Sequence, residues 1–174
     1  MLNQSRLSTL SLPSLPFFPV TCREGSTLLR GRTRRALTAE EITRTCEVLL
    51  AAAIRRRCAF WLLDGRVNTT VHPAELHEWL QEDYFPRVRV QLGQPPCIAL
   101  LVAPCLWQDM FSMGLDAPAQ WPTWSARVGW FKEERDALAW LRHQGAQART
   151  RLQLAGEERQ PLQAGQYQQL SFNF

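Results

Sequence analysis

Two uninterrupted apolar segments constrain the fold of this chain more than any other feature of its sequence. The first covers residues 58–63 and ends at Asp64 and Gly65, a pair that favours a turn; the second covers residues 97–103 and ends at Pro104. A strand that is apolar on both faces needs cover on both faces, as the strands of parallel sheets have. The sequence therefore predicts two central strands of a sheet that is covered by helices.

The clearest helix signal begins at Thr38. Thr38 and Glu41 have the spacing of a capping box, in which each side chain accepts a hydrogen bond from the other residue's backbone N–H. Arginines at 55–57 would lie in the last turn, where positive charge suits the helix dipole. Between these ends, apolar residues recur at the spacing of one helix face, namely Ile42, Cys46, Leu49, Leu50 and Ala53.

Weaker patterns complete the order of elements. They predict a hairpin of strands over 17–23 and 27–33, a second helix from 72 towards 93, a strand over 125–131, and a last helix that begins at 132 and is stopped by Gly145. Strand–helix–strand connections favour parallel pairing. The expected fold class is therefore α/β, with a mixed, mostly parallel sheet of about five strands and helices packed on it.

A chain of 174 residues is the size of one domain. We expect a loose N-terminal segment over 1–15, an α/β domain over 16–145, and a polar C-terminal tail over 146–174, in which 170–174 resembles a short strand. No segment approaches the roughly 18 apolar residues of a membrane span. The first residues also lack the pattern of a signal peptide.

Charge and cysteine usage narrow the class of protein. The net charge is +4, which is less than a DNA-binding domain of this size usually carries, so we expect no specific nucleic acid partner. The five cysteines form no Cys-x-x-Cys, and each stands among apolar residues. This usage indicates a reducing compartment, and we expect the protein in the cytoplasm.

Catalytic and cofactor motifs are missing from the sequence. It has no G-x-S-x-G elbow, no P-loop and no G-x-G-x-x-G. His72 and His77 stand about 140° apart around a helix, so one helix face would not present both to a metal, and the cysteines lack zinc spacing. We therefore expect a protein that is not an enzyme and that holds no metal or cofactor.

Charged residues supply the first candidates for a binding site. Asp64 follows a buried strand, where ligands bind in open α/β sheets, although an Asp before a Gly also forms a turn. Arg30, Arg32 and Arg34 alternate along a predicted strand and should share one face of the sheet. That face is either solvated or meets an acidic partner, a phosphate or an anionic surface.

Tryptophans supply the second set of candidates. Trp107, Trp121 and Trp124 lie in the segment 104–124, which has no clear period and is expected to be a long loop with at most one helical turn. Their side chains either pack in the core or form a surface for a ligand or partner. We assign the tryptophans of the predicted strands and of the second helix to the core.

Several short phrases together carry a resemblance to a known family. They are Thr38-Ala39-Glu40-Glu41, FWLLDGR at 60–66, WLQEDYFP at 79–86, CIALLV at 97–102, and FKEE at 131–134 followed by ALAWL at 137–141. On these residues the chain resembles, over about 17–144, small bacterial STAS-like domains, which are related to the anti-sigma-factor antagonists and described as similar to lipid-binding CRAL-TRIO domains. The resemblance implies helices largely on one side of the sheet, no enzymatic activity, and a role in protein interaction or small-ligand sensing.

The family also carries a phosphorylation switch. Its antagonists have a Ser or Thr at the start of the helix that follows the central strand, and the matching place here, 71–74, includes His72 but no hydroxyl. Thr69 and Thr70 fall just before it. We expect neither threonine to be a regulatory phosphorylation site, because two residues separate them from the first helical turn.

Two functional hypotheses follow from these observations. The first is a regulatory or protein-interaction module of the STAS type, which acts on another protein and could form a homodimer. The alternative is a binder of a small apolar or anionic ligand, lipid-like in character, because the aromatic segment 104–124 would lie beside the strand ends.

Overall fold

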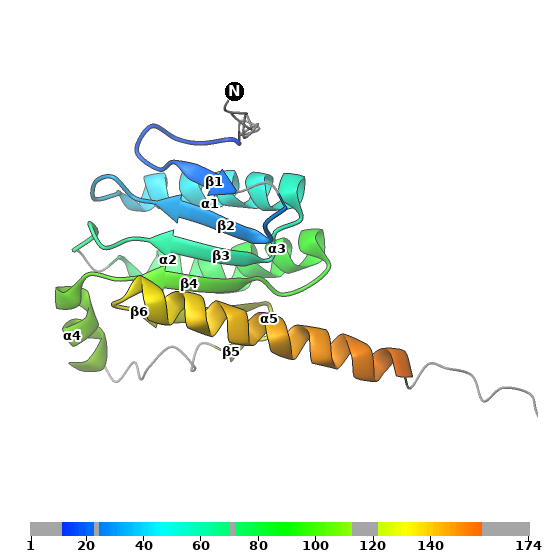
Figure 1. Ribbon diagram of the computed structural model, residues 1–174. Coiled ribbons are helices and arrows are strands. Elements are labelled where there is room, and N and C mark those ends of the chain that lie inside the picture. The colour runs from blue at the N-terminus through cyan, green and yellow to red at the C-terminus, as the bar shows by residue number, and fades with distance from the viewer. Residues whose placement is uncertain (1–11, 23–24, 70–71, 113–121, 158–174) are drawn as a thin grey trace, which may run out of the picture.

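The computed structural model describes residues 12–22, 25–69, 72–112 and 122–157, which form an α/β fold (Figure 1). Its strands are β1 (Val20–Cys22), β2 (Leu28–Arg32), β3 (Phe60–Asp64), β4 (Cys97–Leu101), β5 (Pro122–Thr123) and β6 (Ala126–Phe131). They form one six-stranded sheet in the order β1-β2-β3-β4-β6-β5. β2, β3, β4 and β6 pair in parallel, and the two edge strands pair antiparallel. The predicted mixed, mostly parallel sheet is confirmed.

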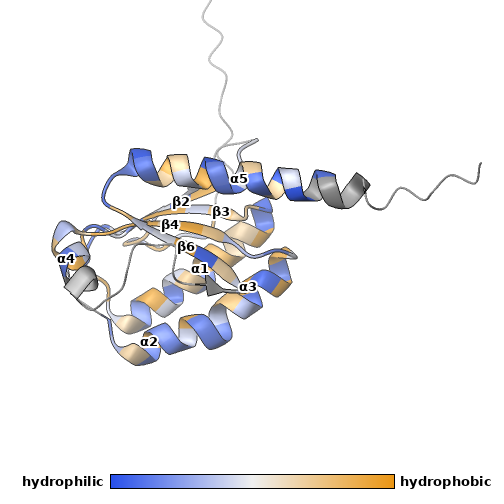
Figure 2. Ribbon diagram, turned by 90° about the horizontal axis from the view of Figure 1, so that it is seen from below, coloured by the Kyte–Doolittle hydropathy of each residue, from blue (hydrophilic) through white to orange (hydrophobic). Residues whose placement is uncertain are grey.

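Helices cover both faces of this sheet (Figure 2). They are α1 (Ala39–Arg56), α2 (Ala74–Trp79), the π-helical turn η1 (Leu80–Tyr84), α3 (Phe85–Leu92), α4 (Pro104–Ser112) and α5 (Glu134–Glu157). α1, α2 and α3 lie on one face, and α5 packs on β3, β4 and β6 from the other. Most of the helices therefore lie on one side of the sheet, and α5 covers the apolar side chains on the other side.

The two central strands are apolar in both directions, as the sequence predicts. Trp61 of β3 and Ile98 of β4 belong to the apolar cluster beneath α1, whereas Leu62 and Ala99 belong to the cluster beneath α5. All four side chains are buried. Burial on both faces explains why these strands lie in the middle of the sheet.

The capping box at the start of α1 is formed. Thr38 Oγ1 accepts a hydrogen bond from the Glu41 N–H at 3.2 Å, and Glu41 Oε2 accepts one from the Thr38 N–H at 3.1 Å. The helix ends at Arg57, whose left-handed backbone (φ 52°) lets its N–H bond back to Ala53 and Ile54. The apolar stripe predicted for this helix faces the sheet.

A proline explains the irregular helix on the same face. α2 continues into η1 and then α3, with Pro86 at the start of α3. Proline has no N–H for the usual bond to the carbonyl four residues earlier. The wider π-helical turn lies directly before this proline, where regular helical bonding would fail.

Residues 104–112 correct one prediction. They form the helix α4, where the sequence predicted a loop with at most one helical turn. Pro104 begins this helix, a position in which proline needs no N–H partner and its fixed φ suits the helix. A backbone bond from the Trp107 N–H to the Ala103 carbonyl at 3.1 Å closes the first turn.

The end of the last helix is a second correction. α5 does not stop at Gly145 but continues to Glu157, so the first part of the predicted polar tail is helical. Gly145 has no left-handed backbone conformation and packs near the Phe60 ring. A glycine ends a helix chiefly by adopting positive φ, and Gly145 does not adopt it.

Replacing Gly145 with alanine should therefore stabilise the protein. A Cβ at this position would lie 3.5 Å from the Phe60 ring, an ordinary contact, and alanine favours a helix over glycine by roughly 0.5–1 kcal/mol. Urea unfolding should show an increase of that size in the free energy of unfolding. Gly93→Ala is the matched control, because Gly93 caps α3 at φ +70° and its replacement should destabilise. A loss of stability in Gly145→Ala would contradict a continuous α5.

The described part of the N-terminal segment is not loose. Leu12 is buried in the main apolar cluster, and Leu15 and Phe18 exchange backbone hydrogen bonds. Residues 1–11 and the predicted strand over 170–174 lie outside the described residues. Among the helices that the structure describes, none has the length and apolar character needed to cross a membrane.

Candidate functional site

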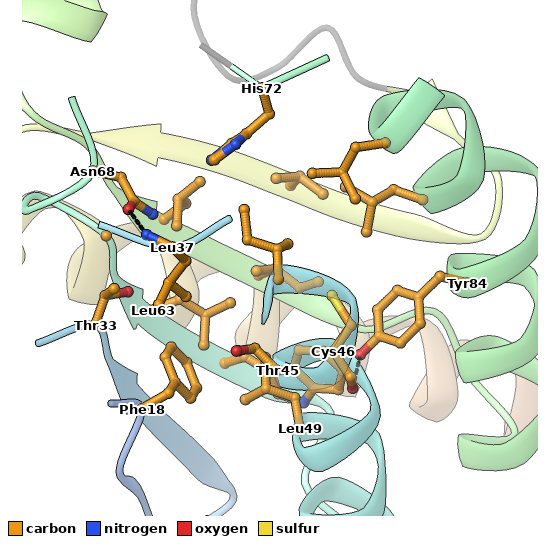
Figure 3. Close-up of a pocket in the computed structure, with 18 of the residues that line it drawn as sticks. Phe18, Thr33, Leu37, Thr45, Cys46, Leu49, Leu63, Asn68, His72 and Tyr84 are labelled. Atoms are coloured by element: carbon orange, nitrogen blue, oxygen red, sulfur yellow. Dashed lines mark hydrogen bonds between the residues drawn. The ribbon is translucent and has the colours of Figure 1, made fainter. Parts of the chain in front are cut away.

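A cavity of about 210 Å³ lies between the sheet and the helices α1 and α2 (Figure 3). Two rows of side chains, each running across β3, β4 and β6 in register, form its floor. The first row is Trp61, Ile98 and Val128, and the second is Leu63, Leu100 and Trp130. We call this space the apolar cavity, because most of its lining is hydrocarbon.

Two helical segments form the opposite wall. α1 contributes residues at helical spacing, and α2, η1 and the start of α3 contribute the rest. These residues are Ile42, Thr45, Cys46 and Leu49 from α1, and Leu76, His77, Leu80, Tyr84 and Phe85 from the second segment. The buried Tyr84 hydroxyl donates to the Cys46 carbonyl at 2.7 Å, which joins η1 to α1. Burial raises the pKa of Tyr84 well above its usual value, so this phenol stays a neutral donor.

Phe18 closes the cavity on the side of β2. Its ring occupies the space that a side chain at position 31 would need, since a Cβ on Gly31 would lie 2.4 Å from the ring. Gly31 pairs with Leu63 in the second row of the floor. A glycine at this point of β2 thus lets the N-terminal segment supply an aromatic wall.

A few polar groups interrupt the lining. They are Thr33, Thr45, Asn68, His72 and His77, and Figure 3 shows Asn68 and His72 on the side of the cavity away from Thr45. Asn68 Oδ1 accepts the Leu37 N–H at 2.9 Å, which fixes the orientation of the amide. Among the described residues that line the cavity, none is Lys, Arg, Asp or Glu.

Burial keeps both cavity histidines neutral at physiological pH. It lowers the pKa of His72 and of His77, and the neighbouring His77 lowers the pKa of His72 further. A neutral imidazole has one donor nitrogen and one acceptor nitrogen. A neutral histidine can therefore either donate a hydrogen bond to an uncharged ligand or accept one from it.

The lowered pKa values of His72 and His77 predict that the protein becomes less stable as the pH falls below about 6.5. An unfolded histidine titrates near pH 6.5, so below about that pH the unfolded chain binds protons that the folded chain does not. The contribution to the free energy of unfolding is complete above about pH 6.5 and is lost as the pH falls towards the folded pKa values. In urea unfolding at pH 7.5 and 5.5, the wild type should lose more stability than His72→Gln/His77→Gln. Equal losses in the two proteins would refute this assignment.

Asp64, Arg30 and Arg32 lie together on the opposite face of the sheet. They line a hollow of about 330 Å³ next to α5, together with Arg66 and Glu134, which we call the charged groove. Arg66 donates to both carboxylate oxygens of Asp64 at 2.8 and 2.9 Å, and these hydrogen bonds lower the pKa of Asp64. Arg30 pairs with Glu134 at 2.7 Å. Each carboxylate of the groove is thus already engaged by an arginine.

The other candidates from the sequence lie apart from both hollows. Arg34 follows β2 and donates to the Pro16 carbonyl at 3.5 Å. Trp107 is half-buried near Lys132, and Trp124 is exposed, with the Arg89 guanidinium 4.5 Å from its ring centroid. Thr69 is exposed, whereas Trp121 and Thr70 lie outside the described residues.

The sequence reasoning missed most of the cavity. It assigned the tryptophans of β3 and β6 to the core, but Trp61 and Trp130 also form the cavity floor, and it considered His72 only as a metal ligand and as part of a switch. One signal was present: Thr45 is a polar residue beside Cys46 on the buried side of α1. A hydroxyl on the apolar face of a helix indicates that a hydrogen-bonding group, from the protein or from a ligand, lies near that face.

Comparisons of this chain with models of protein families, with curated proteins and with solved structures find no match. The STAS-like resemblance therefore stays a prediction.

Proposed function

We propose that this protein binds a small, mostly apolar molecule in the apolar cavity, and that it does so without catalysing a reaction. The cavity between the sheet and α1 and α2 is the observation that carries the proposal. An apolar cavity of about 150 Å³ accepts benzene. A cavity of about 210 Å³ therefore has room for a molecule of roughly eight non-hydrogen atoms.

The lining of the cavity supports an occupant. The cavity is partly open to the outside, so a ligand can enter it, and its floor and most of its walls are apolar. Water fills such a space poorly, because each molecule needs two to four polar partners. A ligand with a hydrocarbon body would contact the apolar side chains of both rows of the floor.

The regulatory role predicted from the sequence is compatible with this proposal. A ligand in the cavity touches the sheet, α1 and α2 at once, so its presence changes how these elements pack. A protein partner that contacts the outer surface of α1 or α2 could then distinguish the filled from the empty state.

Filling the cavity with a larger side chain tests the proposal. Leu63 points into the cavity from β3 (Figure 3), and Leu63→Phe should occupy part of it. The control is Val90→Phe on α3, where the side chain is exposed and does not line the cavity. Toluene should raise the melting temperature of the wild type and of the control, as a ligand of the folded state must.

Calorimetry or NMR titration then gives the affinities. We expect Leu63→Phe to bind toluene at least about ten-fold more weakly than the wild type, which corresponds to about 1.4 kcal/mol. Val90→Phe should match the wild type. Failure of the wild type to bind toluene, or equal binding by Leu63→Phe, would refute the proposed function.

A further inference from the structure

One polar group in the apolar cavity lacks the partner that its environment demands. Thr45 is only 5% exposed, and among the described residues its Oγ1 has no hydrogen-bond partner. Buried hydroxyls in native proteins nearly always have one. Figure 3 shows the Thr45 hydroxyl turned towards the interior of the cavity rather than along the helix.

Another threonine of α1 shows what this hydroxyl would ordinarily do. Thr43 Oγ1 donates to the Ala39 carbonyl, four residues earlier, at 3.1 Å. Thr150 in α5 makes the same bond to Ala146 at 3.2 Å. Thr45 makes no such bond to its own helix, so its hydroxyl remains available to a group inside the cavity.

The charges around the cavity limit what that group can be. The described lining has no cationic or anionic side chain, and its two histidines are neutral. An ionised carboxylate or ammonium would lose its hydration on entry without meeting an opposite charge, which is strongly unfavourable. A neutral hydroxyl or carbonyl loses far less, and the Thr45 hydroxyl can replace one of its water partners.

We propose that the ligand is an uncharged molecule with a hydrocarbon body and a hydroxyl or carbonyl group that hydrogen-bonds Thr45. This inference rests on the proposed function, since it names the class of ligand for the same cavity. It excludes the anionic ligands that the sequence left open. Asn68 and His72, on the side away from Thr45, offer a second set of hydrogen-bonding groups to a ligand that is polar at both ends.

The test compares probes of one chain length on the full-length protein. They are 1-heptanol, heptanoate and heptylammonium at pH 7.5, with toluene as the probe that has no hydrogen-bonding group. We expect the wild type to bind heptanol at least ten-fold more tightly than either ion. An affinity for heptanoate within three-fold of that for heptanol would overturn the inference.

Two variants separate the hydroxyl from the shape of the cavity. Thr45→Val keeps the shape and removes the hydroxyl, and Thr45→Ser keeps the hydroxyl. Thr45→Val should weaken heptanol binding about five- to ten-fold and leave toluene binding unchanged or tighter, whereas Thr45→Ser should keep the preference for heptanol over toluene. The ligand-free Thr45→Val protein should unfold at the same temperature as the wild type or higher, because it no longer buries an unpartnered hydroxyl.

The outcomes distinguish this inference from the proposed function. If toluene binds and Leu63→Phe blocks it, but Thr45→Val leaves the ratio of heptanol to toluene affinity unchanged, the cavity binds ligands and the inference about Thr45 is wrong. If none of the probes binds the wild type, the proposed function fails and the inference fails with it.

Discussion

Trp61→Ala should lower the free energy of unfolding by about 3–5 kcal/mol, as truncation of a large aromatic in a protein core does. Trp61 is 0% exposed in the central strand β3, and its indole N–H donates to the Cys58 carbonyl at 2.9 Å. The substitution removes this hydrogen bond and one of the two tryptophans of the cavity floor. It also enlarges the apolar cavity. The neighbouring side chains of the sheet could fill the vacated space only by moving away from α1.

A second tryptophan is the control for this measurement. Trp124 is 71% exposed and contacts the Arg89 guanidinium at the surface, so Trp124→Ala should cost less than about 1 kcal/mol. Urea or guanidinium unfolding, followed by circular dichroism, compares the two variants with the wild type. A loss below about 1 kcal/mol for Trp61→Ala would mean that β3 is not a central strand.

Gly31→Ala should destabilise the protein by about 1–3 kcal/mol, the usual cost of overpacking. The new methyl group would lie 2.4 Å from the Phe18 ring and 3.1 Å from the Leu63 side chain. Because Phe18 is buried and closes one side of the cavity, its displacement both loses core packing and opens the cavity near β2. The same variant should therefore bind toluene more weakly.

A double-mutant cycle identifies the cause of this loss. In a Phe18→Ala background the ring is absent, so Gly31→Ala should cost much less than it does in the wild type. The coupling is measured from the free energies of unfolding of the two single variants and the double variant. An equal cost of Gly31→Ala in both backgrounds would show that the steric conflict with Phe18 is not what glycine avoids.

The two hollows on opposite faces of the sheet differ in the chemistry that they can support. The apolar cavity lacks charge in its described lining but has polar groups that can reach a ligand. The charged groove has three arginines: Arg30 pairs with Glu134, Arg66 pairs with Asp64, and Arg32 lies 3.8 Å from Asp64. Asp64 is thus held by Arg66 and supports the turn after β3. Of the two roles that the sequence left open for Asp64, these contacts support the one in the turn.

Patterns within a few residues determined the features that the sequence predicted well. The capping box of Thr38 and Glu41 depends on two side chains one helical turn apart, and its outcome needs no distant partner. The apolar runs of β3 and β4 specify central strands because only a position covered on both faces suits them. The α/β class follows from the order of such local signals.

Contacts between distant residues decided what the sequence could not. α5 runs on past Gly145 and lies near Phe60 of β3, and Gly31 is needed because Phe18 packs over it. The apolar cavity requires rows from three strands and a wall from two helical segments, which together span the chain from α1 to β6. Whether Thr45 bonds to its own helix or turns towards a ligand depends on the space opposite α1, and that space exists only once the sheet and the helices have packed together.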